Sequence, residues 1–141
     1  MRIEFTVLGN PRAQKRHRTR QLKDKNFSIR YDPCAKEKND FFRAVQHHAP
    51  EVLFKGPIRV ELVFFLPRPK DHYGTGKNAN KLKKTAPEWH IKKPDIDNLV
   101  KWILDALSSV FWSDDSIICD LYVAKRYDEK PRTVIVIETL T

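Results

Sequence analysis

The acidic residues between positions 95 and 115 are the part of this chain whose types and spacing could support chemistry. Asp95 and Asp97 are separated by one residue, and Asp114 and Asp115 form a second acidic pair further along. Carboxylates grouped in this way repel one another unless protons or a bound cation neutralise them. Mg²⁺ prefers oxygen ligands and keeps waters that a phosphate can displace. The pattern therefore predicts a metal site for phosphodiester hydrolysis, where the ion polarises a phosphoryl oxygen and activates a water.

A helix over residues 95–109 should position these acids. Its apolar residues recur at three- and four-residue steps, as in the buried stripe of an amphipathic helix. They are Ile96, Leu99, Val100, Ile103, Leu104, Leu107 and Val110. Asp95 is placed as the N-cap, with a carboxylate that can accept from free amides of the first turn. Asp97, Lys101 and Asp105 share the face away from the core, so Lys101 lies about one turn from Asp97 and could stabilise a charged transition state.

Each of these acids also has an ordinary structural explanation. Asp95 can be only a helix cap, Asp97 with Lys101 a surface ion pair, and Asp114 with Asp115 a solvated turn. Caps and turns, however, do not require acids at both ends of one helix. The helix spans roughly 20 Å. Asp115 can therefore join the other acids only if the chain folds back past the helix, for example as a strand antiparallel beside its N-terminus.

Three stretches of the acidic segment form a compound pattern. They are Lys-Pro-Asp-Ile-Asp-Asn-Leu-Val-Lys at 93–101, Leu-Asp-Ala-Leu at 104–107 and Phe-Trp-Ser-Asp-Asp at 111–115. Together they resemble the signature of RusA-type Holliday junction resolvases, which are endonucleases encoded largely by phages and prophages. The resemblance is close over residues 92–125 and looser elsewhere. As a compound pattern it is far more specific than a lone Asp-x-Asp.

The resemblance implies site residues, a cofactor and an assembly. Asp95, Asp97 and Asp115 would bind Mg²⁺ and be essential, Lys101 would assist catalysis, and Asp114 would be a neighbouring acid without an assigned role. It also implies a homodimer of α+β protomers. A C₂ dimer with two active sites would suit the approximate two-fold symmetry of a four-way junction. The expected activity is Mg²⁺-dependent, paired cutting of such DNA junctions in recombination and repair.

Positive charge is concentrated in two segments. The chain has a net charge of +9 and a pI near 9.7, and residues 12–30 and 67–93 hold sixteen of its 27 lysines and arginines. Basic loops of this kind are typical of polyanion-binding surfaces. The candidate DNA contacts are Lys15, Arg16, Arg18, Lys92 and Lys93.

Two other function classes also fit part of this pattern. A non-catalytic nucleic-acid-binding module would explain the basic loops, and its acids would be caps and turns. A Mg²⁺-dependent hydrolase of a small phosphoester would explain the acids, but it would not need so many cations. Cleavage assays with junction, duplex and single-stranded DNA, with and without Mg²⁺, would separate these classes from a junction endonuclease.

The rest of the chain predicts one α+β domain over residues 1–141, with helices packed on one face of a mixed four-stranded sheet. The expected elements are, in order, a strand at 2–8, a helix at 33–49, a strand at 58–66, the helix at 95–109 and strands at 117–124 and 133–139. Asp32 should cap the first helix and Pro50 should stop it. The strand at 58–66 should lie centrally. The last two strands should form a β-hairpin.

The remaining segments are expected to be loops. Residues 11–18 are polar without an apolar period, and residues 67–93 form a long connection that we expect to be a functional or disordered loop near the metal site. Cys34 and Cys119 lie far apart without zinc-ligand spacing, so a structural zinc site is not expected. No apolar run is long enough to suggest a signal peptide or a membrane span, and we expect a cytoplasmic protein without a membrane partner.

Overall fold

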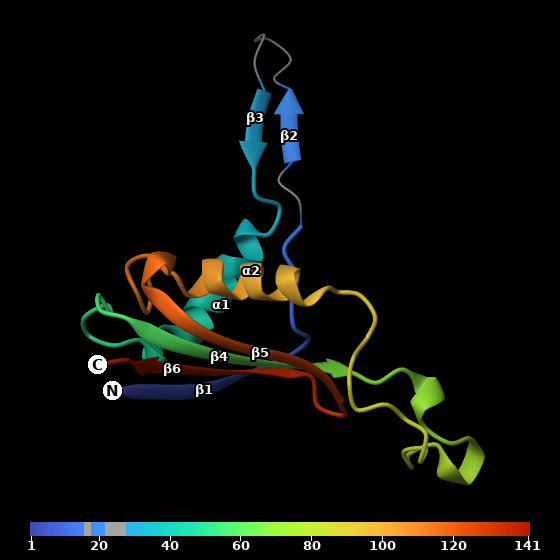
Figure 1. Ribbon diagram of the computed structural model, residues 1–141. Helices are drawn as coiled ribbons and strands as arrows, with labels where there is room; N and C mark the ends of the chain where they lie inside the picture. The colour runs from blue at the N-terminus through green and yellow to red at the C-terminus, as the bar shows by residue number, and fades with distance from the viewer. Residues whose placement is uncertain (16–17, 22–27) are drawn as a thin grey trace.

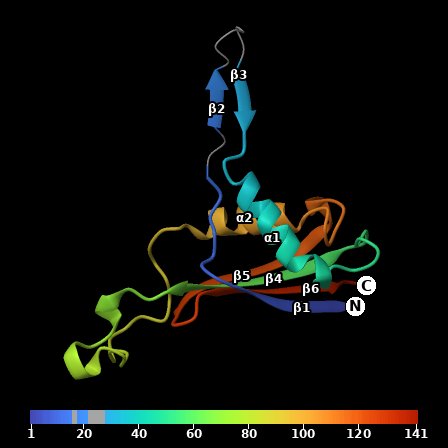
Figure 2. The same ribbon diagram turned by 180° about the vertical axis from the view of Figure 1, so that it is seen from behind.

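A four-stranded sheet forms the base of the molecule, and two helices lie on one of its faces (Figures 1 and 2). The computed structural model describes residues 1–15, 18–21 and 28–141. The sheet strands are β1 (Arg2–Leu8), β4 (Ile58–Pro67), β5 (Ile118–Asp128) and β6 (Arg132–Thr139). The helices are α1 (Ala35–Val45) and α2 (Ile96–Leu107). The strand order is β1-β6-β4-β5, with only β4 and β5 parallel. The predicted mixed sheet with two helices on one face is therefore confirmed.

Strand β4 organises the core, as its position between β5 and β6 predicts. Alternate residues of β4 are buried on the face that the helices cover. These residues are Ile58, Val60, Leu62, Phe64 and Leu66. The apolar stripe of α2 packs against them through Leu99, Trp102, Ile103 and Leu107, all of which are buried in the same core. Burial of this stripe fixes the rotation of α2 and turns its polar face, with Asp97 and Lys101, to solvent.

Strands β5 and β6 are consecutive but do not pair with each other, because β4 lies between them. The expected β-hairpin is therefore wrong. The connection over residues 129–131 can reach across one strand, since two strand spacings amount to roughly 10 Å and an extended residue covers about 3.3 Å. Alternation of apolar residues identifies a half-buried strand, but it does not identify the neighbour to which that strand bonds.

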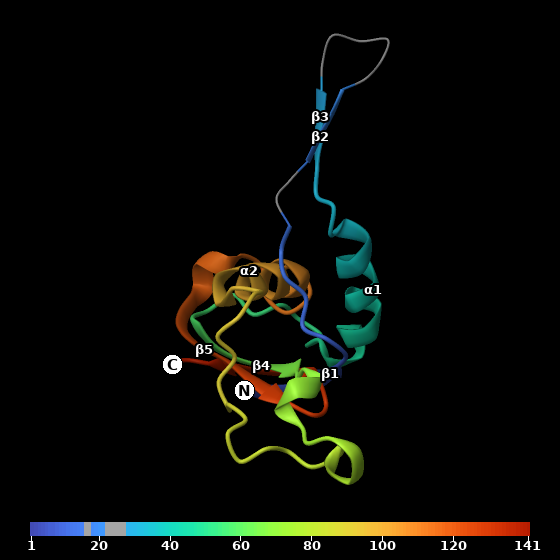
Figure 3. The ribbon, with the colours of Figure 1, turned by 90° about the vertical axis from the view of Figure 1, so that its right-hand side faces the viewer.

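A second sheet of two short strands extends away from the helix layer (Figures 1 and 3). Strands β2 (Arg18–Gln21) and β3 (Ser28–Tyr31) are antiparallel, and Arg18 is opposite Tyr31. We refer to these two strands as the arm. This strand pair was not predicted, and Arg18 was expected in a loop, because neither strand has the apolar alternation that burial would require. Just before the arm, the backbone amide of Gln14 donates to the backbone carbonyl of Asn98 at 3.0 Å, and this bond ties the segment that leads to the arm to α2.

Helix α1 begins at Ala35, slightly later than predicted, and its N-cap is Cys34, so the prediction of Asp32 as the cap is wrong. Asp32 instead stabilises the turn that precedes the helix. Asp32 Oδ1 accepts from the Cys34 amide at 2.9 Å and from Gln14 Nε2 at 2.9 Å, and its other oxygen lies 2.7 Å from Lys38 Nζ. Burial alone would raise the pKa of Asp32, but the hydrogen bonds from Lys38, Cys34 and Gln14 hold it well below its usual range. Asp32 therefore links the arm to α1 as a carboxylate.

The connection between β4 and α2 is folded on itself beyond the sheet (Figure 1). It contains the short 3₁₀ turns η2 (Lys70–His72) and η3 (Gly76–Asn78), and Tyr73 forms a β-bridge with Leu82. A Cβ at Gly74 would lie 2.6 Å from Asn78 Cβ, so only glycine fits there. Within the ranges described above, no helix combines the length and the apolar character needed to span a membrane.

Candidate active site

Two carboxylates lie at the start of α2. Asp95 occupies the N-cap position with extended backbone, and Asp97 lies in the first turn. The position of Asp95 is as predicted, but its side chain makes no capping hydrogen bond; only its carbonyl accepts, from the Leu99 amide at 3.2 Å. Both side chains are exposed. Among the described residues, neither carboxylate has a hydrogen-bond or ion-pair partner, so both are available to a ligand.

Lys101 is also exposed, one turn further along α2. The side-chain contacts of the described residues include no ion pair between Lys101 and Asp97, which removes the simplest structural explanation of their spacing. Asp105, on the same face, instead lies 3.4 Å from Lys38 on α1. The first half of α2 thus presents two acids and one base whose charges are not neutralised by each other.

Lys125 fixes the segment that leads into α2. Its ammonium group donates to the Lys92 carbonyl at 2.7 Å and to the Pro94 carbonyl at 2.8 Å, and so joins the middle of β5 to the residues just before Asp95. Further along β5, the Tyr127 amide donates to the Glu88 carbonyl at 2.9 Å. This role of Lys125 was not predicted from the sequence. The available signal was a lysine in register with inward-facing residues of a half-buried strand, where an unpaired charge is unfavourable.

His90 lies beneath this segment and not at the acids. It is buried, and its ring centroid is 4.8 Å from that of Tyr127. Burial lowers the pKa of His90, and the positive charges of Lys125 and Lys92 lower it further, so the imidazole is neutral at pH 7. His90 therefore packs against β5 and supports the segment that carries Lys92 and Lys93.

Asp115 lies at the opposite end of α2. It begins the turn η4 (Asp115–Ile117), and its Oδ1 accepts from Nε1 of the buried Trp112 at 2.7 Å. Its neighbour Asp114 accepts from the Ser116 amide at 2.9 Å and caps that turn. Helix α2 has 12 residues and is roughly 18 Å long; Asp95 precedes its first residue, and Asp115 follows its last residue by eight positions.

The protomer therefore brings together only part of the predicted metal set. Strand β5 does return past α2, but Asp115 precedes that strand and stays at its far end (Figure 1). In the described ranges, no group of three or more histidine, cysteine or acidic side chains could hold a metal ion. Asp95, Asp97 and Lys101 share one end of α2, and Asp115 lies at the other.

Several of the predicted DNA contacts lie around the start of α2. Lys92 and Lys93 are exposed and directly precede the Pro94-Asp95 step, and Lys15 is exposed beside the residue that bonds to Asn98. Figure 3 views the molecule from this end, where the segment before the arm passes α2. Arg16 and the side chain of Arg18 lie outside the described residues.

Comparison with known proteins gives consistent matches along nearly the whole chain. Residues 9–138 match the family described as endodeoxyribonuclease RusA. The uncharacterized protein YqaN of Bacillus subtilis (strain 168) is 33% identical over 147 residues, which covers 99% of this chain and 97% of YqaN. The crossover junction endodeoxyribonuclease rusA of Lactococcus phage r1t is 28% identical over 137 residues, which covers 94% of this chain and 93% of the phage protein.

Proposed function

Because the chain belongs to the RusA endodeoxyribonuclease family, we propose that it is a Mg²⁺-dependent endonuclease that resolves four-way DNA junctions in recombination and repair. The observation that carries this proposal is the start of α2. There the carboxylates of Asp95 and Asp97 and the ammonium group of Lys101 are exposed, and no described residue pairs with them. Exposed, unpaired acids beside a lysine are the groups that metal-assisted phosphodiester hydrolysis needs.

The chemistry of the donor set fits Mg²⁺. Mg²⁺ is usually bound by one or two carboxylates together with waters and substrate phosphates, and Asp95 and Asp97 supply two carboxylates at the start of α2. The bound ion would supply a polarised phosphoryl oxygen and an activated water. Lys101 would hold the extra negative charge that develops on the phosphoryl group. Lys125 would keep Asp95 in place, because it fixes the carbonyl of the residue before it.

The cations around this site would hold the DNA backbone. We assign phosphate contacts to Lys15, Arg16, Arg18, Lys92 and Lys93, of which Lys15, Lys92 and Lys93 are exposed around the start of α2. Each such contact releases counterions, so log affinity should fall with log salt by about 0.9 per phosphate neutralised.

Asp115 would reach the metal site through a second copy of the chain. Strand β5 is an edge strand, and its first half carries exposed apolar side chains, with Leu121 at 43% and Tyr122 at 45%. An exposed apolar edge is a favoured place for strand pairing between chains. The second half of this edge is covered, because Trp89 forms a β-bridge with Arg126. A homodimer that pairs the free halves of β5 would use the whole uncovered edge.

One register of such a pair would bring the two sets of acids together. Antiparallel pairing about a two-fold axis at Leu121 places Ile117 of one copy opposite Lys125 of the other. Lys125 holds the residue before Asp95, so Asp115 of the first copy would approach Asp95 and Asp97 of the second. Each of the two sites would then contain acids from both copies. Two sites related by a C₂ axis suit paired cuts in a junction of similar symmetry.

The test is cleavage of labelled four-way junction, duplex and single-stranded DNA with and without Mg²⁺. We expect paired cuts in the junction only when Mg²⁺ is present. Asp97→Asn should abolish cutting and leave junction binding intact, whereas Asp105→Asn, a matched change on the same helix, should cut normally. Full cutting by Asp97→Asn would reject the assignment. Metal-independent binding without any strand scission by the unaltered protein would instead identify a non-catalytic DNA-binding module.

A further inference from the structure

The connection between β4 and α2 carries positive charge that the proposed active site does not use. We refer to its first part, residues 67–88, as the lysine lobe. The lobe contains six lysines and arginines but only two acids. Among the described side chains, no ion pair involves a lysine of the lobe, and the acid Glu88 is already paired with Arg126 at 3.5 Å. The unpaired lysines are all exposed, and they are Lys70, Lys77, Lys81, Lys83 and Lys84.

The backbone of the lysine lobe is fixed by hydrogen bonds of its own. The Gly74 amide donates to the Lys81 carbonyl at 2.9 Å and closes the lobe on itself. At its base, the Arg68 guanidinium donates to the Pro87 carbonyl at 2.6 Å and joins the two ends of the lobe. A surface that is already ordered loses less conformational entropy when a ligand binds. The lysines are therefore carried by a folded element that is prepared for a ligand.

The lysine lobe lies within reach of DNA that occupies the proposed active site. In Figures 1 and 3 the lobe and the arm extend in different directions, and the start of α2 lies between them. Lys84 precedes Lys93 by nine positions, so their Cα atoms are at most about 32 Å apart. One turn of B-form DNA is longer than this, at about 34 Å. A duplex that leaves the start of α2 towards the lobe meets it within the first helical turn.

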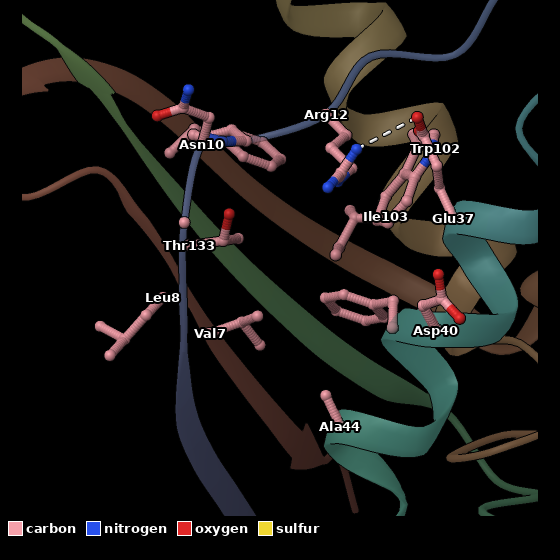
Figure 4. Close-up of a pocket in the computed structure, with 14 residues that line it drawn as sticks. Val7, Leu8, Asn10, Arg12, Glu37, Asp40, Ala44, Trp102, Ile103 and Thr133 are labelled. Atoms are coloured by element: carbon pink, nitrogen blue, oxygen red, sulfur yellow. Dashed lines mark ion pairs between the residues drawn. The ribbon is translucent and has the colours of Figure 1, made fainter.

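The face around α1 is less suited to phosphate. A cavity of about 250 Å³ lies there between β1 and the helices, and Glu37 and Asp40 line it from α1 (Figure 4). Arg12 also lines this cavity, but its guanidinium lies 3.1 Å from the Glu37 carboxylate and is already paired. Acidic groups repel the DNA backbone, whereas a surface of unpaired lysines attracts it. Charge complementarity therefore favours the lysine lobe as the DNA contact.

We propose that the lysine lobe binds the phosphate backbone of one duplex arm of the junction, within one helical turn of the branch point. The proposal rests on the proposed function, since it takes a four-way junction as the substrate. The lobe follows Pro67, which is paired with Asp128 at the end of β5. A two-fold axis at Leu121 leaves that end of each β5 away from the axis. The two lobes of the proposed homodimer would then hold two different arms.

The first experiment measures junction binding as a function of salt concentration, without Mg²⁺ so that no strand is cut. The lobe variant combines Lys81→Gln, Lys83→Gln and Lys84→Gln. The slope of log affinity against log salt should fall by about 2.7 if all three lysines contact phosphates, because each contact contributes about 0.9. Between about 50 and 200 mM salt, the unaltered protein should then lose about 40-fold more affinity than the lobe variant does.

The control variant removes the same charge from exposed positions outside the lobe. It combines Lys36→Gln, Arg43→Gln and Lys55→Gln. Its slope should match that of the unaltered protein. An equal fall in both variants would show that net charge alone sets the salt dependence, and it would overturn the proposal. A fall below about 0.9 in the lobe variant, which is less than one phosphate contact, would overturn it as well.

The second experiment locates the contact on the DNA. Uncharged methylphosphonate linkages replace the phosphates roughly four to ten base pairs from the branch point in each arm, within one helical turn. The unaltered protein should bind this junction more weakly than the fully charged one, and the lobe variant should show a smaller difference, because the two changes remove the same contacts. The same linkages at the outer ends of long arms should have no effect.

Two outcomes of the second experiment would overturn the proposal. They are unchanged binding of the neutralised junction by the unaltered protein, and a difference that is undiminished in the lobe variant. Junction cutting with Mg²⁺ tests the proposed function separately. The lobe contact can fail while cutting persists, and binding through the lobe can persist in a protein that never cuts.

Discussion

Mixing two inactive variants would test whether each active site is shared between two copies. Asp95→Asn and Asp115→Asn remove acids that lie before and after α2, a helix roughly 18 Å long. Each variant alone should fail to cut, because every site in its dimer lacks one acid. In a mixed dimer, one site receives Asp115 from one chain and Asp95 from the other and is intact, whereas the second site lacks both.

The expected recovery follows from counting sites. Random exchange at equal concentrations makes about half of the dimers mixed, and each mixed dimer has one intact site of two, so about a quarter of the unaltered strand-cutting capacity returns. The cuts should be nicks in one strand, because no mixed dimer has two working sites. The assay is denaturing gel analysis of a labelled junction after subunit exchange, with mixed dimers quantified by tags of different mass.

The matched control mixes Asp95→Asn with Asp97→Asn. Both acids come from the same end of one chain, so every site in that mixed dimer remains damaged and no activity should return. Recovery in this control, or normal cutting by Asp115→Asn alone, would refute the shared site. Absence of recovery in the first mixture, with mixed dimers present, would refute it equally.

Three further predictions concern residues that support the site and the fold. Lys125→Met loses two hydrogen bonds to backbone carbonyls before α2, so the acids should be misplaced and junction cleavage should fall about tenfold or more. Junction affinity should not change, and the control Lys130→Met, at an exposed lysine, should cleave normally. Trp112→Phe removes the bond that orients Asp115, so half-maximal cleavage should require more Mg²⁺. The depressed pKa of Asp32 means that its carboxylate stabilises the fold above its ordinary pKa of 3.8 and loses this effect as pH falls towards the depressed value. Urea unfolding should therefore show that Asp32→Asn lowers the free energy of unfolding by about 1–3 kcal/mol at pH 7, and that this difference from the unaltered protein disappears in acid.

The main elements of the fold were predictable because their signals are local. The four-residue spacing of Leu99, Ile103 and Leu107 identified α2, and alternation from Ile58 to Leu66 identified a central strand. Strand partners are not a local property, so the neighbours of β5 and β6 were predicted wrongly. The arm was missed for a related reason. Its strands are not buried, so no apolar pattern marks them.

The residues of the candidate site were proposed from the sequence, whereas their geometry could not be. Spacing placed Asp97 and Lys101 on one face of α2, and the structure confirms that both are exposed there. The distance between Asp95 and Asp115 depends on where η4 lies relative to the start of α2, which no motif specifies. The supporting role of Lys125 was hidden as well, because its partners are backbone carbonyls and these carry no sequence signal.

Asp95 is the residue of the proposed site that departs most clearly from local preference. An aspartate at an N-cap normally accepts from amides of the first turn, and forgoing that bond costs about 0.5–2 kcal/mol. Here the N-cap position is correct and the capping bond is absent, while Lys125 holds the preceding backbone in place. A carboxylate that satisfied the helix would have fewer free oxygens for a metal. Departures from local rules of this kind concentrate at functional sites. If Asp95 were only a cap, Asp95→Asn would cut junctions normally, since asparagine caps helices as well as aspartate does.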